Sequence, residues 1–465
     1  MSSFTEPNGM GARLAGAWSR ADGPGTLVSG AWAQAEVEAR TQSPEARGAG
    51  SLSLADRLRP RRWVLPQRVA YLLAAAMIGL CLFGSVVPSP LYPLYAADWH
   101  FAALTVTLIY ATYAFGVLAA LLLAGRVSDQ IGRRPVLLIS VGGLMVAWLL
   151  FIAAQSTAWL FVARGLQGLA TGAALSAASA ALLDLHRRHD PVGAGLANAV
   201  ASCAGLGLGL LVSSILVQAG PAPRTLPYVM LLVLSAVALA GAYWMPEPVR
   251  KQGRFRLTPQ RPSVPAGIRH PFLLASLAVL GSWSIGGLFF SIGDQLSAHL
   301  LNTSNVVLAS LAGVLLTLPA AVAQLGFQRM PPWLGASAGP AVLTVGLVTV
   351  VIATAADSSA VFLAGMVIAG VGFGVAFLGG LRQLTAVIPA EHRASVMSAF
   401  YVVAYSSLSL PAVIAGLVVT HLGLETTFEV FGAIVAAVAL TMAVEAWRTR
   451  PTREVRKPGE LHEAA

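Results

Sequence analysis

The feature that most constrains this chain is a series of long apolar stretches without lysine, arginine, aspartate or glutamate. Residues 99–124 and 135–163 form two of them, and a short charged segment separates the two. About 20 helical residues, each rising ~1.5 Å, cross a hydrocarbon core of ~30 Å. Only 11% of the residues are charged, whereas soluble domains average about 25%. We therefore predict a membrane protein with many spans.

The stretches are too long and too uniformly apolar for the alternating strands of a membrane barrel. Helices satisfy their backbone polar groups internally, which a lipid environment demands. The sequence therefore predicts an all-α membrane protein with twelve transmembrane helices. Their expected ranges are 69–90, 103–124, 135–154, 158–183, 193–218, 225–245, 272–294, 304–327, 336–355, 359–382, 394–419 and 425–446.

An internal repeat divides these helices into two sets of six. Four residues of the fifth helix correspond to residues 200 positions later in the eleventh, three of them identical, and Gly168 and Gly172 recur 202 positions later as Gly370 and Gly374. The four pairs are Ala194 and Ala394, Asn198 and Ser398, Ala199 and Ala399, and Leu208 and Leu408. Two pseudo-symmetric six-helix bundles with a site between them at mid-depth are the architecture that such a repeat implies.

The expected domain organisation follows from the composition of the segments between helices. Residues 1–62 are rich in small, polar and charged residues, which predicts a disordered cytoplasmic tail without a cleaved signal peptide. The other expected parts are a first bundle over 66–246, a cytoplasmic linker over 247–271, a second bundle over 272–447 and a cytoplasmic tail over 448–465.

The basic residues indicate how the chain is oriented. All but two of the 30 lysine and arginine residues fall on one side of the predicted helices, the exceptions being Arg164 and Arg224. Basic loops face the cytoplasm, so we expect both termini there. The net charge of +10 thus reflects membrane topology, and we expect the lipid bilayer rather than nucleic acid as the surrounding partner.

The most informative short segment is the loop between the second and third predicted helices, Gly125-Arg126-Val127-Ser128-Asp129-Gln130-Ile131-Gly132-Arg133-Arg134. This segment resembles the G-x-x-x-D-x-x-G-R-R loop of the major facilitator superfamily, and it stands at the same place in a twelve-helix chain. The matching positions are Gly125, Asp129, Gly132, Arg133 and Arg134. The resemblance implies a cytoplasmic gate that holds the two halves together when the central cavity opens outward. A basic membrane anchor is the alternative interpretation.

A second motif lies in the fourth predicted helix. Arg164, Gln167 and Gly168, with Gly172 beyond them, are similar to the R-x-x-Q-G motif of the same superfamily, which the resemblance links to proton coupling. Arginine keeps its proton, so it would hold an anion or act on a neighbouring carboxylate. We expect Arg164 to face the cavity, and a structural role in binding carbonyls of the first helix is the alternative. The first helix contains no acid to pair with it.

Two further features are candidates for packing and for coupling. Gly205 and Gly209 fit the glycine spacing of the superfamily's antiporter motif in the fifth helix, and close helix packing through small residues is the alternative.

Asp294, near the end of the seventh helix, is a candidate for substrate binding or coupling if it is buried. A solvated acid at the outer rim is the simpler interpretation.

Other residues concern the shape and lining of the bundle. Prolines 88, 90 and 93 are expected to end the first helix and to free backbone carbonyls. Seven aromatic residues could line an apolar cavity, although most are expected to pack between helices. They are Tyr110, Tyr113, Trp283, Phe289, Phe290, Tyr401 and Tyr405.

The sequence gives no sign of an enzyme or of a bound cofactor. It contains no phosphate-binding G-x-x-x-x-G-K-[ST] loop, no metal-spaced histidines, no paired intramembrane acids and no nucleophile motif. The two cysteines, Cys81 and Cys203, fall inside predicted spans and are expected to be packing residues rather than a disulfide. We therefore expect no catalytic residue, metal or cofactor.

The resemblance implies a secondary transporter of a bacterial cytoplasmic membrane that works by alternating access, as a monomer. A mostly apolar site with one cation suggests export of a drug-like or amphipathic small molecule, with protons moved in the same or the opposite direction. Uptake of an anionic metabolite bound by Arg164 is one alternative. A transporter-like sensor or assembly protein that moves nothing, and that uses residues 1–62 to bind partners, is another.

Overall fold

The computed structural model describes residues 64–124, 127–248, 261–389 and 392–449. Contacts divide the chain into two units, Met1–Trp63 and Val64–Ala465, and all described residues belong to the second. Gly125, the predicted tail over 1–62, residues 249–260 of the linker and most of the C-terminal tail lie outside the described residues. The described residues contain helices and no strand, so the all-α prediction is confirmed.

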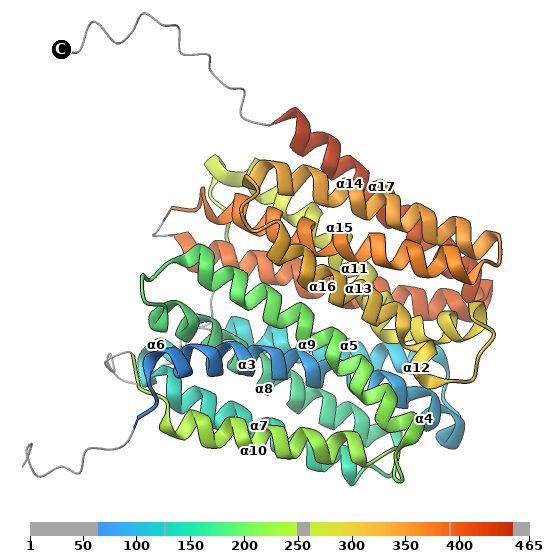
Figure 1. Cartoon of the computed structure of the whole chain (residues 1–465), viewed down its shortest axis with the longest axis horizontal. Coiled ribbons are helices and arrows are strands. Elements are labelled where there is room, and N and C mark those ends of the chain that lie inside the picture. The colour runs from blue at the N-terminus through green and yellow to red at the C-terminus, as the bar shows by residue number, and fades with distance from the viewer. Residues whose placement is uncertain (1–63, 125–126, 249–260, 390–391, 450–465) are drawn as a thin grey trace, which may run out of the picture. The chain divides into compact units, whose positions relative to one another are not determined.

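The first half of the bundle runs from Gln67 to Trp244 (Figure 1). Its elements are α3 (Gln67–Val86), the 3₁₀ turn η2 (Ser89–Leu91), α4 (Tyr92–Trp99), α5 (Ala103–Ala124), α6 (Val127–Ile131), α7 (Arg133–Ile152), α8 (Thr157–Leu185), α9 (Pro191–Ala219) and α10 (Leu226–Trp244).

The second half follows with the same order of long helices. Its elements are η3 (Ala266–Ile268), α11 (Arg269–Leu300), α12 (Val306–Ala309), α13 (Leu311–Gly326), α14 (Pro332–Ala355), α15 (Ser359–Thr385), α16 (Arg393–Leu422) and α17 (Leu424–Arg448). Eleven spans in the described part of the chain are long and apolar enough to cross a membrane, and α13 is a shorter apolar helix of 16 residues.

Two predicted helix boundaries were wrong for reasons of local backbone chemistry, and the seventh helix ends at Leu300 instead of residue 294. The helix expected over 304–327 is divided into α12 and α13 at Ser310, whose dihedrals (φ −79°, ψ −3°) fall in the bridge region that opens a helical turn. The first helix ends at Val86 instead of residue 90. After it, the prolines do not end the span, because the chain continues through η2 into α4.

The two halves are built on one plan. In the first half α8 packs on α5, α7 and α3, and in the second half its counterpart α15 packs on α13, α14 and α11. The same correspondence relates the pair α3 and α9 to α11 and α16, and the pair α7 and α10 to α14 and α17. This matching set of neighbours is what an internal structural repeat produces.

The halves meet along two equivalent helix pairs, α5 with α16 and α9 with α13. We call the end of the bundle where α5 ends and α7 begins the loop end, and the opposite end the far end. Near the far end a Cβ on Gly416 of α16 would collide with the side chain of Thr107 of α5. On the other pair, a Cβ on Gly207 would lie 2.8 Å from the Thr317 hydroxyl oxygen. Small residues thus let the halves approach closely.

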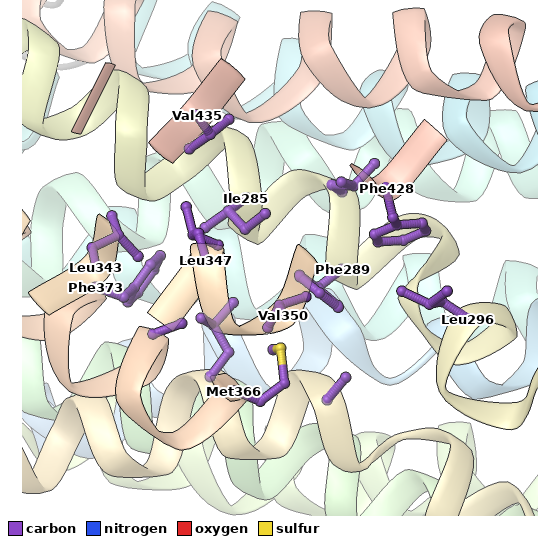
Figure 2. Packing of buried hydrophobic residues seen from close by; sticks show 14 of the residues in the cluster. Ile285, Phe289, Leu296, Leu343, Leu347, Val350, Met366, Phe373, Phe428 and Val435 are labelled. Carbon is purple, nitrogen blue, oxygen red and sulfur yellow. The ribbon is translucent and has the colours of Figure 1, made fainter. Parts of the chain in front are cut away.

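Each half also has its own core. In the second half, large apolar side chains of α11, α14, α15 and α17 interdigitate (Figure 2). The Phe289 and Phe428 rings lie 5.2 Å apart between centroids in this cluster. In the first half, Phe151 stacks on Tyr228 with centroids 4.8 Å apart. Because lipid tails are themselves apolar, such packing stabilises the fold through dispersion contacts more than through removal of apolar surface from water.

Candidate functional site

A cavity of about 260 Å³ lies between the two halves. Its walls come from α3, α5, α8 and α9 of the first half and from α11, α15 and α16 of the second. Leu121 and Leu381 line it near the ends of α5 and α15, and Gly195 lines it near the start of α9. The cavity therefore reaches from mid-depth toward the loop end, and no residue of the segment 86–108 lines it.

The wall from the second half is aromatic. Trp283 stands at its middle, with its ring 5.6 Å from that of Phe377 and 5.2 Å from that of Tyr405. The wall consists of Trp283, Phe290, Phe373, Phe377, Phe400, Tyr401 and Tyr405. Such a surface can stack against a flat ring or attract a cation to the ring faces.

The wall from the first half is neutral and carries most of the polar side chains of the cavity, set among leucines 82, 121, 175 and 206. Besides Tyr110 and Tyr113, it presents Ser85, Ser176, Ser179, Asn198, Ser202 and Cys203. The hydroxyl of Ser202 donates to the backbone carbonyl of Asn198 at 2.8 Å and is thereby occupied. Among the described residues, none that lines the cavity carries a formal charge at neutral pH. The cavity is therefore suited to an uncharged ligand with an aromatic part and a hydrogen-bonding part.

The sequence named the aromatic residues as possible lining residues but predicted that most of them pack between helices. Six of the seven aromatic residues named as possible lining residues do line the cavity, and Phe289 packs in the core of the second half instead. The polar wall was missed. A sequence signal for it exists, because Ser176 and Ser179, and likewise Asn198 and Ser202, are spaced three or four residues apart and so share one helix face.

Arg164 is fully buried and forms a compact hydrogen-bonded group. Its Nε donates to the hydroxyl of Tyr92 at 2.8 Å, and its Nη1 donates to the carbonyl of Ser85 at 2.7 Å and to Gln167 Oε1 at 3.0 Å. The Gln167 amide donates to the carbonyl of Gly84 at 2.9 Å. Arg164 and Gln167 thus bind the end of α3, which is the structural alternative named above, and neither side chain lines the cavity.

The prolines after α3 explain why these carbonyls need side-chain partners. The Gly84 carbonyl would ordinarily accept the amide hydrogen of residue 88, but Pro88 has none. Gln167 supplies the missing donor, and Ser213 of α9 donates to the nearby carbonyl of Val87 at 2.7 Å. The negative end of the α3 dipole also favours the Arg164 cation at this position.

Aromatic rings complete the surroundings of the Arg164 guanidinium. Its central carbon lies 5.4 Å from the ring centroid of Tyr113, 5.6 Å from that of Tyr92 and 5.9 Å from that of Tyr110, distances typical of cation–π contacts. The Nη2 atom has no hydrogen-bond partner in the described part of the chain. No carboxylate there forms an ion pair with Arg164. This cation is balanced by dipoles and ring faces.

Asp294 lies near the far end of α11 and outside the cavity lining. Its side chain is half-buried, and its Oδ2 accepts a hydrogen bond from the Ser310 hydroxyl at 3.2 Å, at the break between α12 and α13. Within the described ranges it forms no ion pair, whereas His299 and Glu425 at the same end pair with each other at 2.7 Å. Asp294 therefore joins two helices through a contact that a proton could alter.

The described part of the loop after α5 is organised around Arg133. Its Nε donates to Asp184 of α8 at 3.0 Å, its Nη1 donates to the Ser128 hydroxyl at 2.8 Å, and it also pairs with Asp129. Arg133 is buried, with 8% of its surface exposed. The guanidinium of Arg134 lies 5.1 Å from the ring centroid of Tyr243. These partners all belong to the first half.

Glu247, just beyond α10, fixes where α7 begins. Its two carboxylate oxygens accept the backbone amides of Arg133 at 2.9 Å and Arg134 at 3.0 Å. Gly132 precedes them with φ of 105°, a conformation that favours glycine, and a Cβ there would lie 2.6 Å from a Glu247 oxygen. The carboxylate therefore caps the positive end of α7 and ties the start of the linker to the loop.

We expect Glu247→Ala to loosen this loop. Loss of a capping acceptor costs about 0.5–2 kcal/mol, and hydrogen exchange of peptides spanning residues 128–136 should become faster by the corresponding factor. Glu445→Ala, which removes an exposed partner of His270, is the control and should leave these peptides unchanged. Equal exchange of residues 128–136 in the Glu247→Ala protein and the unaltered protein would refute the capping role.

The four motif glycines lie where helix backbones touch. On the pair α5 and α8, a Cβ on Gly168 would overlap the carbonyl oxygen of Tyr113, and one on Gly172 would lie 2.6 Å from the carbonyl oxygen of Val117. On the pair α3 and α9, Gly205 meets the backbone of Gly79, and Gly209 meets that of Phe83. Both pairs border the cavity, so these glycines set the spacing of its first-half wall.

The two halves are joined at the far end. The hydroxyl of Ser89 in η2 donates to the carbonyl of Phe290 in α11 at 2.7 Å. Near the same end, Gln218 of α9 accepts the backbone amide of Val306 in α12 at 2.7 Å. Both bonds cross from one half to the other. They close the cavity on the side opposite the loop end.

Comparisons with known proteins give a consistent family. The model of a family described as the Major Facilitator Superfamily matches residues 69–412. Among curated relatives, the multidrug resistance protein MdtL of Salmonella dublin is 32% identical over 131 residues. That match covers 28% of this chain and 31% of the relative, so the chain matches about a third of the length of such relatives. MdtL of Salmonella typhi matches to the same extent.

Solved structures show the same fold. The human organic anion transporter MFSD10 (TETRAN) superposes with a TM-score of 0.60 at 17% identity, over 82% of this chain and 100% of that one. The nucleoside transporter NupG, in a variant form, superposes with a TM-score of 0.60 at 14% identity, over 83% of this chain and 100% of that one. At these identities the likeness concerns the architecture alone.

Proposed function

The chain belongs to the Major Facilitator Superfamily, whose members are transporters that bind small molecules within a membrane, and on that premise we propose that it is a secondary active exporter. The substrate we propose is a small, drug-like or amphipathic compound, moved out of the cell in exchange for protons. The observation that carries the proposal is the uncharged cavity between two matching halves, bounded by an aromatic wall and a neutral polar wall.

The proposed mechanism is alternating access. The positive-inside rule assigns the loop end to the cytoplasm of a bacterial cell membrane, with both termini on that side. The structure then corresponds to a state in which the cavity faces inward and the bonds from Ser89 and Gln218 keep the outer side closed. Substrate would enter from the cytoplasm, and the halves would rock around it until the outer side opens.

We propose that the loop of Asp129, Gly132, Arg133 and Arg134, together with Gly125, acts as the inner gate. In the inward-facing state the arginines are held by groups of the first half. In the outward-facing state the loop would contact the second half and hold the inner side closed. The guanidinium of Arg133 already has three partners in the first half. Its orientation would therefore be fixed before the second half moves into contact with the loop.

Export is supported by two observations. The partial likeness to MdtL relates the chain to a protein named for multidrug resistance. The alternative of anion uptake needs Arg164 in contact with substrate, yet Arg164 is enclosed by aromatic rings and carbonyls outside the cavity lining. Arg164 and Gln167 are therefore proposed to shape the substrate site through α3, and the protein is proposed to act as a monomer.

The proposed function is tested by binding followed by flux. Purified protein is screened by thermal shift against metabolites and drugs, and a ligand at ~100 times its Kd should add about 2.7 kcal/mol to the free energy of unfolding. Each stabilising compound is then assayed in proteoliposomes with an imposed pH gradient. We expect accumulation on the side with the higher proton concentration. Compounds that bind tightly but cross in neither direction would favour the sensor alternative instead.

Asp294 is proposed to carry the coupling proton. It is a half-buried carboxylate held by a neutral hydroxyl, so protonation would change its bond to Ser310 at the α12–α13 break. We expect Asp294→Asn to lose accumulation driven by a pH gradient while it retains exchange of substrate for substrate. Asp98→Asn, which alters an exposed acid paired with Arg224 at the same end, should keep both activities. Normal pH-driven accumulation by Asp294→Asn would exclude Asp294 as the coupling group.

A further inference from the structure

One side chain of the polar wall has an unused hydrogen-bonding group. Asn198 lies on α9, lines the cavity and is only half-buried. Among the described residues its side-chain amide has no hydrogen-bond partner, whereas the neighbouring Ser202 hydroxyl is occupied by the carbonyl of Asn198 itself. The Asn198 side chain offers both donors and an acceptor, and no other described residue of the cavity lining has a side-chain amide.

The part of the opposite wall that α11 and α15 form offers ring faces, with the indole N–H of Trp283 as a hydrogen-bonding group, and the hydroxyls of Tyr401 and Tyr405 lie on α16. Trp283, Phe290 and Phe377 are held by contacts within the second half, such as the 5.6 Å contact between the rings of Trp283 and Phe377. A ligand between the walls would therefore have its flat, apolar face toward α11 and α15 and its polar group toward α9.

The surroundings also exclude a strong preference for ions. In the part of the chain that the structure describes, no charged residue lines the cavity. Arg164 is occupied by Tyr92, Ser85 and Gln167, and Asp294 lies outside the lining. An anion would lose hydration in this cavity without gaining a counter-charge. A cation would gain about 0.5–2 kcal/mol from the ring faces, which is less than the several kcal/mol that its loss of hydration costs.

We propose that the cavity selects neutral, planar aromatic compounds that carry one amide-like group, and that Asn198 is the specificity-determining residue that binds this group. The inference rests on the proposed function, because it names the substrate class of the same cavity. Loss of a hydrogen bond leaves a polar group of the ligand desolvated and unpaired. The amide should therefore raise affinity when Asn198 is present and give no advantage when it is absent.

The test compares two probes of nearly the same shape. Benzanilide has two aromatic rings joined by an amide, and trans-stilbene has the same rings joined by a hydrocarbon link. Binding of each is measured by calorimetry on the purified full-length protein. We expect benzanilide to bind at least about tenfold more tightly than trans-stilbene, and Asn198→Leu to remove most of that difference.

Two comparisons separate the role of Asn198 from general damage. Unchanged affinity of Asn198→Leu for trans-stilbene would show that the cavity remains intact. Thr441→Ala removes a hydroxyl from the exposed face of α17, outside the cavity lining, and should leave the affinity for benzanilide unchanged. The charged analogue biphenyl-4-carboxylate and the cation tetraphenylphosphonium should bind more weakly than benzanilide.

Three outcomes would overturn the inference. They are equal affinity for benzanilide and trans-stilbene, undiminished benzanilide binding by Asn198→Leu, and tighter binding of either ion than of benzanilide. None of these outcomes bears on transport itself. The proposed function fails separately, when ligands found by the screen bind but are not moved across a membrane.

Discussion

Replacing Gly168 by leucine is expected to prevent the protein from accumulating in a folded form. The backbones of α5 and α8 touch at this point, and a Cβ on Gly168 would overlap the carbonyl oxygen of Tyr113 and lie 3.0 Å from the Cα of Gly116. Overpacking ordinarily costs about 1–3 kcal/mol because side chains can move aside. Here the obstacle is backbone, so the helices themselves would have to separate and the cost should exceed that range.

The effect of Gly168→Leu is measured by the yield of monodisperse protein in detergent and by its midpoint of thermal unfolding. Gly142→Ala in α7 provides the control, because a Cβ there meets no atom within 4 Å and alanine favours a helix over glycine. This variant should keep the yield of the unaltered protein. Similar yields for Gly168→Leu and Gly142→Ala would mean that the close approach of α5 and α8 is unnecessary for folding.

Replacing Arg164 by methionine is expected to abolish transport. The change leaves the Ser85 carbonyl and the Tyr92 hydroxyl without their donor inside the bundle. Bonds from a charged donor contribute about 1.5–3 kcal/mol each, and relief of the buried charge offsets part of the loss. We expect a net destabilisation of about 2–5 kcal/mol, concentrated at the end of α3, where Ser89 bonds the second half.

Hydrogen exchange distinguishes this local effect from general unfolding. In Arg164→Met, peptides covering residues 84–95 should exchange faster than those of α10, and substrate flux should fall to the background of empty liposomes. Arg164→Lys should show the same pattern, since an ammonium cannot reproduce the fork of guanidinium donors. Arg224→Met, which removes a half-exposed arginine from the far end, should retain flux. Normal flux in Arg164→Met would contradict a role for Arg164 in shaping the site.

The sequence predicts the arrangement of helices well because the membrane imposes a simple rule. A span must be long and apolar, so charged loops such as Asp129–Arg134 mark the boundaries directly. The two misplaced boundaries involve local backbone chemistry that hydropathy does not register. At Pro88 the lost amide hydrogen is compensated by Gln167 from another helix, and at Ser310 a side-chain bond to Asp294 accompanies the break. Both compensations are tertiary contacts.

The site was harder to predict because its residues are separated widely in the chain. Arg164 is conspicuous in the sequence as a cation within a span. The direction in which its side chain points depends on the free carbonyls at the end of α3, just before Pro88. Asn198 was named only as part of the internal repeat, since one amide in a helix rich in alanine and glycine forms no motif and its spacing from Ser202 is a weak signal. Its importance appears only when α9 faces the aromatic residues of α11 and α15 across the cavity.

The central claim is that the two halves rock around this cavity, and paired distance measurements test it most directly. Spin labels are placed on exposed positions of opposite halves in a protein without Cys81 and Cys203, at Arg188 and Val387 for the loop end and at His100 and Asn302 for the far end. Pulsed electron paramagnetic resonance is recorded in lipid at two pH values, with and without ligand. Alternating access predicts that one distance shortens as the other lengthens. Distributions that stay fixed at both ends under every condition would contradict it.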